Sequence, residues 1–318
     1  MNNMERARQV FEAHCHADRD TIINQMVKAG IKATTASTYY VGLKKTMPVR
    51  QTAGIPPVVE ETDDEIKARI VERFAAMELM AESTLLGMNR SLIISGPPGL
   101  GKSYGVTAKA REVQSVGGKT VVQISGDVSG AGLYRSLYEN RGENCTTIFD
   151  DADSVFDSEV TLNLLKAACD STEQRNICWM KEIRMEDDDG TRLPTSFPFD
   201  GSVIFITNKD FPAMISRQTK MSPHLAALVS RSMYLDLLLK TPRDYLVRIK
   251  HVVFDEEMYR LHNLKVREAE QIVDFIEENL TKFREYDLSL RLVIKIANWF
   301  KADQSNWKRL SAITFFKS

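Results

Sequence analysis

The chain has 318 residues, of which 43% are hydrophobic and 27% charged, and its formal net charge is −1. These values are typical of a soluble globular protein, and they exclude wholesale disorder and a chain-wide attraction to nucleic acid. No apolar run approaches the roughly 18 residues of a membrane span, and the polar start lacks a signal-peptide core. The four cysteines form no CxxC pair, which predicts reduced thiols. We therefore expect a cytoplasmic protein without a membrane partner.

Residues 1–46 are expected to form a small helical domain. Apolar side chains recur at helical spacing in three short segments, and Gly30 ends the second, so a tight turn joins the last two as in a helix-turn-helix. Residues 1–50 hold eight Lys/Arg and four Asp/Glu, a local excess of +4. The domain is expected to contact either DNA or a protein partner. A DNA contact would use side chains of the third helix, namely Thr35, Ser37, Thr38, Tyr39, Lys44 and Lys45.

A linker and two larger regions follow this domain. Residues 47–62 contain three prolines and no periodic pattern, which is typical of an extended linker. Helix and strand patterns then alternate, which predicts an α/β core with a mostly parallel sheet and helices on both faces. Only amphipathic helices are expected near the C-terminus. The predicted division is a helical domain (1–46), a linker (47–62), a core (63–240) and a helical lid (241–318).

Hydrophobic patterning predicts the individual elements. An Asp-Gly pair at residues 189–190 predicts a projecting β-hairpin between residues 183 and 203. Strands are expected at 92–95, 120–125, 146–150, 203–207 and 234–237, and a further segment of the alternating pattern lies at 177–183. Core helices are expected at 63–83, from 102 onward, at 133–139 and at 159–169. Lid helices are expected at about 242–261, 266–281, 288–300 and 303–313.

A phosphate-binding loop lies between the first expected strand and the helix that begins at Lys102. Residues 96–103 read GPPGLGKS and fit the pattern G-x-x-x-x-G-K-[ST] in full. The glycines let successive backbone N–H groups turn toward an anion, the lysine supplies a cation for the β- and γ-phosphates, and the Ser103 hydroxyl can ligate Mg²⁺. The expected nucleotide-binding residues are Gly96, Pro97, Pro98, Gly99, Leu100, Gly101, Lys102, Ser103 and Tyr104.

Two carboxylates end the expected strand at 146–150. A strand adjacent to the phosphate loop is expected to bring Asp150 near the magnesium ion, directly or through its waters. Asp151, the next residue, can polarise the attacking water. These carboxylates therefore predict the second half of a nucleotide site.

The loop at 96–103, together with the run IFDDAD at 148–153, resembles the two Walker motifs of the AAA+ ATPase superfamily. The resemblance implies ATP and Mg²⁺ as ligands, and an α/β AAA+ P-loop core with a parallel sheet flanked by helices and a C-terminal helical lid. The family generally has glutamate where this chain has Asp151. The shorter side chain sets the carboxylate back by about 1.5 Å, which the backbone could absorb or which could slow hydrolysis.

Three further residues match the family in order. Asn208 resembles the sensor 1 residue that orients water, although a strand-ending turn is the alternative for an asparagine there. Arg231 resembles the arginine finger that reaches a neighbouring subunit's nucleotide; Arg217 is the second choice for that role, and a surface salt bridge is the alternative for Arg231. Arg291 resembles sensor 2 and would contact the γ-phosphate from the lid. A finger acting between subunits implies a homo-oligomeric ring, with a hexamer as one option.

The loop at 126–132 occupies the place of the family's central-pore loop. Tyr134 follows it and would grip a substrate there, or would pack within its helix as the alternative. No Lys or Arg precedes this tyrosine, so charge gives no indication of a DNA-tracking loop.

The overall pattern is similar to AAA+ ATPases of DNA transactions encoded by bacteriophages, which implies the host cytoplasm as location. The predicted function is an oligomeric ATPase that hydrolyses Mg-ATP to remodel DNA or a DNA-bound protein complex. The alternatives are an ATP-gated adaptor or loader with weak hydrolysis, and a protein unfoldase.

Overall fold

The computed structural model describes residues 2–14, 19–46, 61–180, 186 and 190–317. The chain divides into two compact units, unit 1 (Met1–Glu60) and unit 2 (Glu61–Ser318). The predicted linker lies almost wholly outside the described residues, and the acidic tip of the predicted hairpin lies outside them too. No helix among the described residues is long and apolar enough to cross a membrane.

The described part of unit 1 contains three helices that pack around a small apolar core. The α1 helix begins with a capping box, in which Asn2 accepts from the backbone N–H of Glu5 and the Glu5 carboxylate accepts from that of Asn2. Gly30 has a φ of +90° and allows the tight turn between the second and third helices. The helices are α1 (Asn3–Ala13), α2 (Arg19–Lys28) and α3 (Ala33–Thr46). Their shared core contains Ala7, Ile22, Met26, Ile31, Ala36, Tyr40 and Leu43.

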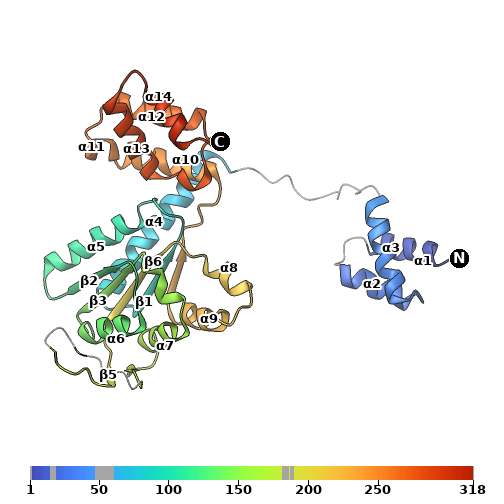
Figure 1. Ribbon diagram of the computed structural model, residues 1–318, viewed down its shortest axis with the longest axis horizontal. Helices are drawn as coiled ribbons and strands as arrows, with labels where there is room; N and C mark the ends of the chain where they lie inside the picture. Colours follow the sequence, from blue (N-terminus) through green and yellow to red (C-terminus); the bar gives the residue numbers. More distant parts are fainter. Residues whose placement is uncertain (1, 15–18, 47–60, 181–185, 187–189, 318) are drawn as a thin grey trace. The chain divides into compact units, whose positions relative to one another are not determined.

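Unit 2 contains a five-stranded sheet in which all neighbouring strands are parallel (Figure 1). The strand order is β2-β3-β6-β1-β7. The central strands β1 and β6 are buried along their whole length, as expected for a parallel sheet covered on both faces. The strands are β1 (Ser91–Ser95), β2 (Thr120–Ser125), β3 (Cys145–Asp150), β6 (Ser202–Thr207) and β7 (Met233–Asp236).

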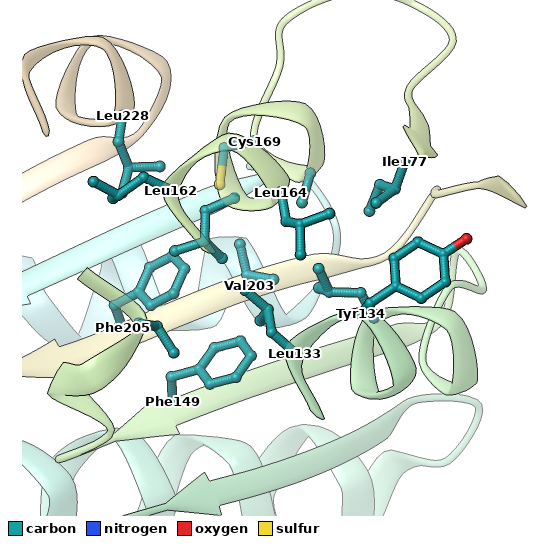
Figure 2. Packing of buried hydrophobic residues seen from close by; sticks show 14 of the residues in the cluster. Leu133, Tyr134, Phe149, Leu162, Leu164, Cys169, Ile177, Val203, Phe205 and Leu228 are labelled. Carbon is teal, nitrogen blue, oxygen red and sulfur yellow. The ribbon is translucent and has the colours of Figure 1, made fainter. Parts of the chain in front are cut away.

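Helices cover both faces because successive strand residues point to opposite sides. Ile148 and Ile204 pack with α4 and α5, whereas Phe149 and Phe205 pack with α6, α7 and α9 (Figure 2). The predicted α/β class is thereby confirmed. The helices of this layer are α4 (Asp63–Leu85), α5 (Lys102–Val116), α6 (Gly130–Glu139), α7 (Glu159–Ala168), α8 (Phe211–Ser216) and α9 (Ser222–Arg231), with a short 3₁₀ turn η1 (Asp153–Phe156).

The segment expected at 177–183, of which the structure describes residues 177–180, does not join this sheet. The β4 strand (Asn176–Cys178) instead pairs antiparallel with β5 (Ser196–Pro198) in a separate two-stranded sheet. The main sheet offers β4 no place beside β3, because β2 and β6 already occupy both edges of that strand. An antiparallel bridge between Glu186 and Arg192 continues the hairpin, so its pairing starts earlier in the chain than predicted.

The lid belongs to unit 2 and has its own apolar cluster. The first expected lid helix, 242–261, is interrupted. A π-helical turn, η2, follows α10, and Glu257 takes a left-handed φ of +56° before α11 begins. The lid elements are α10 (Pro242–Lys250), η2 (His251–Asp255), α11 (Met258–Leu261), α12 (Val266–Glu278), η3 (Glu285–Asp287), α13 (Leu290–Ala302) and α14 (Trp307–Phe315).

Candidate active site

The loop between β1 and α5 has the backbone shape that its glycines permit. Gly99 and Gly101 adopt left-handed φ values of +74° and +96°. A Cβ at Gly99 would stand 2.8 Å from the Cβ of Ser289, so the lid approaches the loop too closely for any larger residue. Leu100 is fully buried in the core beneath the loop and anchors it there.

The Lys102 ammonium group lies inside the loop. Its Nζ donates to the carbonyl oxygens of Gly96 and Pro97 at 2.5 and 2.7 Å, and to Oδ1 of Asn208 at 2.9 Å. Burial lowers the pKa of Lys102 to about 8, against the opposing effect of the carboxylates of Asp151 and Asp150. The loop therefore holds a buried cation whose charge is sensitive to pH.

Ser103 and Asp150 are in direct contact. Ser103 Oγ donates to Asp150 Oδ1 at 2.8 Å, and Gln123 Nε2 donates to Asp150 Oδ2 at 3.0 Å. Burial raises the pKa of Asp150, although these hydrogen bonds act in the opposite direction. The β6 strand lies between β3 and β1. Asp150 still reaches Ser103, since the carboxyl ends of parallel strands share one edge of the sheet.

Asp151 is held in an unusual conformation beside Asp150. Its φ is +53°, a left-handed value that is uncommon for a residue other than glycine. Its backbone N–H donates to the Ile206 carbonyl at 3.1 Å, and its Oδ1 accepts from Asn208 Nδ2 at 3.0 Å. Asn208 therefore joins Asp151 to Lys102 through the two ends of one amide group.

Lys102, Ser103, Asp151 and Asn208 border a cavity of about 420 Å³ between the core and the lid, whereas Asp150 is not part of its wall. Six of the nine expected nucleotide-binding residues line it, whereas Gly96, Pro97 and Leu100 do not. Asp151 and Asn208 line it as well. The apolar part of the wall comes from both core and lid and includes Phe74, Met77, Val252, Met258, Leu261 and Ile294.

The lid contributes two arginines to the cavity wall. Arg291 was predicted from the resemblance, and it shares the wall with Lys102. No motif marked Arg248, which is buried with its guanidinium 3.7 Å from the ring centroid of Phe74 and its Nη1 2.8 Å from Glu256 Oε1. Burial lowers the pKa of Arg248. The one signal in the sequence is that Arg248 stands between two apolar residues, Val247 and Ile249.

The lid is also bonded to the phosphate loop directly. The backbone N–H of Leu290, the first residue of α13, donates to the Gly99 carbonyl at 2.9 Å. Arg291 follows immediately, so the position of its side chain depends on the same contact. The loop and the lid helix are therefore one connected structure on this side of the cavity.

Arg231 lies away from the cavity. Its Nε contacts Asp170 Oδ2 at 3.1 Å and its Nη1 donates to the Ala227 carbonyl at 2.9 Å. The side chain is 35% exposed. Arg217, the second choice for the finger, follows α8 on the surface and also lies outside the cavity wall. Within one chain, neither arginine is part of the cavity wall that contains Lys102.

The substrate-gripping role predicted for Tyr134 is wrong. The side chain is fully buried in the apolar cluster of Figure 2. Its hydroxyl donates to the Pro194 carbonyl at 2.8 Å, and its ring contacts those of Trp179 and Phe197. Tyr134 joins α6 to the hairpin because α6 turns its apolar face toward the core. The alternative of helix packing is the correct one.

Comparison with known proteins gives one close relative. The chain is 35% identical over 253 residues to an uncharacterized 36.7 kDa protein of the nrdC-mobD intergenic region of Enterobacteria phage T4, which covers 80% of this chain and 76% of the relative. The chain belongs to the family of this phage protein. No family model matches the sequence. The parallel sheet, phosphate loop, carboxylate strand and helical lid of unit 2 are the arrangement that the resemblance of its motifs to AAA+ ATPases implied.

Several solved structures are similar to the chain at low sequence identity. A variant of RuvB from Thermotoga maritima is 13% identical, with a TM-score of 0.41 over 79% of this chain and 68% of that one. NtrX from Brucella abortus in complex with ATP is 14% identical, with a TM-score of 0.42 over 97% and 69%. C. elegans PCH-2 is 14% identical, with a TM-score of 0.37 over 78% and 67%.

Proposed function

We propose that the chain is an ATPase that binds Mg-ATP in the cavity between core and lid and hydrolyses it. The observation that carries this proposal is the meeting of three pairs of groups at one edge of the sheet: Lys102 with the loop carbonyls, Ser103 with Asp150, and Asn208 with Asp151. A cation, a metal-binding pair and a carboxylate near solvent are the parts that phosphoryl transfer to water requires.

The residues present fit a magnesium ion. Ser103 and Asp150 would hold it, since their oxygens are already 2.8 Å apart. Among the described residues no cluster of three or more His, Cys, Asp or Glu side chains could hold a metal alone. A site completed by phosphate oxygens and water suits Mg²⁺, which seldom takes all its ligands from protein. The ion would neutralise charge on the phosphates.

The remaining residues have distinct roles in this proposal. Lys102 binds the β- and γ-phosphates. Its ammonium group would then donate to phosphate oxygens in place of the carbonyl oxygens of Gly96 and Pro97. Asp151 accepts a hydrogen bond from the attacking water, and Asn208 positions that carboxylate. Arg291 brings a positive charge from the lid to the γ-phosphate. The short side chain and left-handed backbone of Asp151 also support the alternative of slow turnover, in which ATP binding alone controls assembly.

We propose further that Arg231 acts between subunits of a homo-oligomeric ring, with a hexamer as one option. Its partial exposure and its place at the end of α9 support this role. The guanidinium would exchange Asp170 for the nucleotide of a neighbour. Unit 1 would contact DNA or a DNA-bound protein, because α3 exposes Thr34 and Thr38 and follows the tight turn of a helix-turn-helix.

Hydrolysis is tested with Lys102→Ala. The variant is expected to lose at least about 10²-fold in ATP turnover, the order seen when one charge-stabilising group is removed. Lys109→Ala is the matched control, because Lys109 lies on the same helix and pairs with Glu112 outside the cavity. Full activity in Lys102→Ala would overturn the site.

Assembly and partner are tested by two further measurements. Arg231→Ala should bind ATP without hydrolysing it, and mixing with Lys102→Ala should restore turnover, since each variant supplies what the other lacks. Absence of restored activity would argue against a shared site. ATPase rates are then compared with DNA, with an unfolded polypeptide and without either, at fixed salt. Stimulation by polypeptide alone identifies an unfoldase, and assembly without turnover identifies an adaptor.

A further inference from the structure

Charge is divided unevenly between the two halves of the lid. Residues 281–318 contain eight Lys/Arg and three Asp/Glu, a net side-chain charge of +5. Residues 241–280 contain six Lys/Arg and nine Asp/Glu, a net charge of −3. The chain as a whole has a formal charge of −1. A concentrated basic region therefore lies within a nearly neutral protein.

The fold brings much of this charge together at the end of α14. The backbone N–H of Lys317 donates to the Lys282 carbonyl at 2.8 Å, beside the bridge between Phe283 and Phe316. Lys282 Nζ lies 5.8 Å from the ring centroid of Phe316, and Lys295 Nζ lies 5.7 Å from that of Phe315. We call five exposed cations of α13, α14 and these flanking turns the basic lid surface: Lys282, Lys295, Lys308, Arg309 and Lys317.

These cations are held by neutral groups. Lys282 donates to the Asn279 side chain and Lys317 to the Thr281 carbonyl, while Lys308 lies over the ring of Trp307. Within the described part of the chain none of the five makes an ion pair with a carboxylate. In the other half of the lid, by contrast, carboxylates pair with Arg243, Arg248, Lys250 and Arg260. The positive charge of the basic lid surface is therefore uncompensated.

Large apolar side chains are exposed on the same elements. Tyr286 and Ile313 are each 71% exposed, and Tyr286 is in contact with Arg284 in the turn that carries Lys282. Exposed rings among basic groups are typical of surfaces that bind nucleic acid, where cations contact phosphates and a ring stacks on a base. Figure 1 shows α14 on the side of the lid away from the sheet.

We propose that the basic lid surface binds the phosphate backbone of a nucleic-acid strand, with Tyr286 as a stacking platform. Lysine is suited to this role, because it acts as a point charge without demanding one geometry. The α13 helix then links the two ligands of the lid: Arg291 lines the nucleotide cavity, and Lys295 lies one turn further along the same helix. That link rests on the proposed ATPase function, whereas binding of nucleic acid does not.

Binding is tested with the full chain in the absence of nucleotide. The triple variant Lys282→Gln/Lys295→Gln/Lys317→Gln is compared with a control triple, Lys220→Gln/Lys240→Gln/Arg267→Gln, which removes the same charge from exposed positions elsewhere in unit 2. Fluorescence anisotropy of labelled single-stranded DNA and RNA is measured over a range of salt. The first triple is expected to weaken binding at least about tenfold and to reduce the salt slope by about 2 to 3, whereas the control retains both.

Three other outcomes of the binding experiment would overturn the proposal. Equal losses in both triples would mean that only net charge matters, and unchanged binding would place the contact elsewhere. A change in oligomer mass by light scattering, with nucleic-acid binding intact, would identify a second copy of the chain as the occupant. Thermal melting shows that the variants fold. Tyr286→Ser should weaken binding of single strands by about fivefold or more and leave duplex binding unchanged. If the unmodified chain lacked ATPase activity but bound nucleic acid, that result would bear on the proposed ATPase function and not on this surface.

Discussion

The two ends of the cavity between core and lid are built in different ways. The phosphate end comes from one edge of a parallel sheet, where Lys102, Asp150 and Asn208 lie at the ends of adjacent elements and are joined by short hydrogen bonds. The lid end comes from helix faces, with apolar side chains around one buried arginine, Arg248. The phosphate end depends on particular hydrogen-bonding side chains at fixed positions, whereas the lid end depends on the packing of apolar side chains.

This difference teaches where substitutions should be tolerated. A polar network at the phosphate end depends on each donor and acceptor, so a single isosteric change removes its function. The apolar wall at the lid end distributes its contribution over many contacts, and volume-conserving changes there cost little. The Gly99 to Leu290 hydrogen bond joins the two ends.

The largest expected effect is at the phosphate end. Asp151→Asn should keep ATP affinity within about twofold but reduce turnover by roughly 10²-fold, about 3 kcal/mol of transition-state stabilisation, because the amide cannot act as a carboxylate toward water. Steady-state kinetics and nucleotide binding measure the two quantities. Asp157→Asn is the control, since Asp157 pairs with Lys209 outside the cavity. Turnover close to that of the wild type in Asp151→Asn would remove this carboxylate from the mechanism.

A smaller effect is expected from pH. With the pKa of Lys102 at about 8, its charge is largely present at pH 7.5 and is lost as pH rises through 8. Phosphate binding favours the charged form, so binding at higher pH must take up a proton. Between pH 7.5 and 9 the Kd for ATP should rise about eightfold, as measured by calorimetry. Lys102→Met should bind weakly at every pH, and an equally steep pH dependence in that variant would assign the effect to another group.

The smallest effect is expected where the two ends meet. Leu290→Pro removes the N–H that bonds Gly99, and proline is tolerated at the first residue of a helix. ATP affinity should fall about fivefold, the worth of one hydrogen bond. Leu290→Ala is the matched control, because it keeps the N–H and loses only the side chain. Equal affinities in the two variants would show that the hydrogen bond does not connect loop and lid.

Much of the phosphate end was predictable because its requirements are local. Left-handed glycines, a lysine and a hydroxyl at set spacing define the loop, and an apolar strand that ends in carboxylates defines Asp150 and Asp151. The strand order was not predictable from these segments. Placing β6 between β1 and β3 depends on contacts between residues far apart in the chain.

The sequence by itself determined the phosphate loop, the carboxylate strand, the α/β class and the helical lid, because each depends on backbone conformation or on hydrophobic period within a short segment. Only the tertiary structure decided that Tyr134 is buried against Trp179, that Arg231 pairs with Asp170, and that Arg248 enters the cavity. The partner of a side chain depends on which distant segment packs beside it, and the local sequence pattern does not identify that segment.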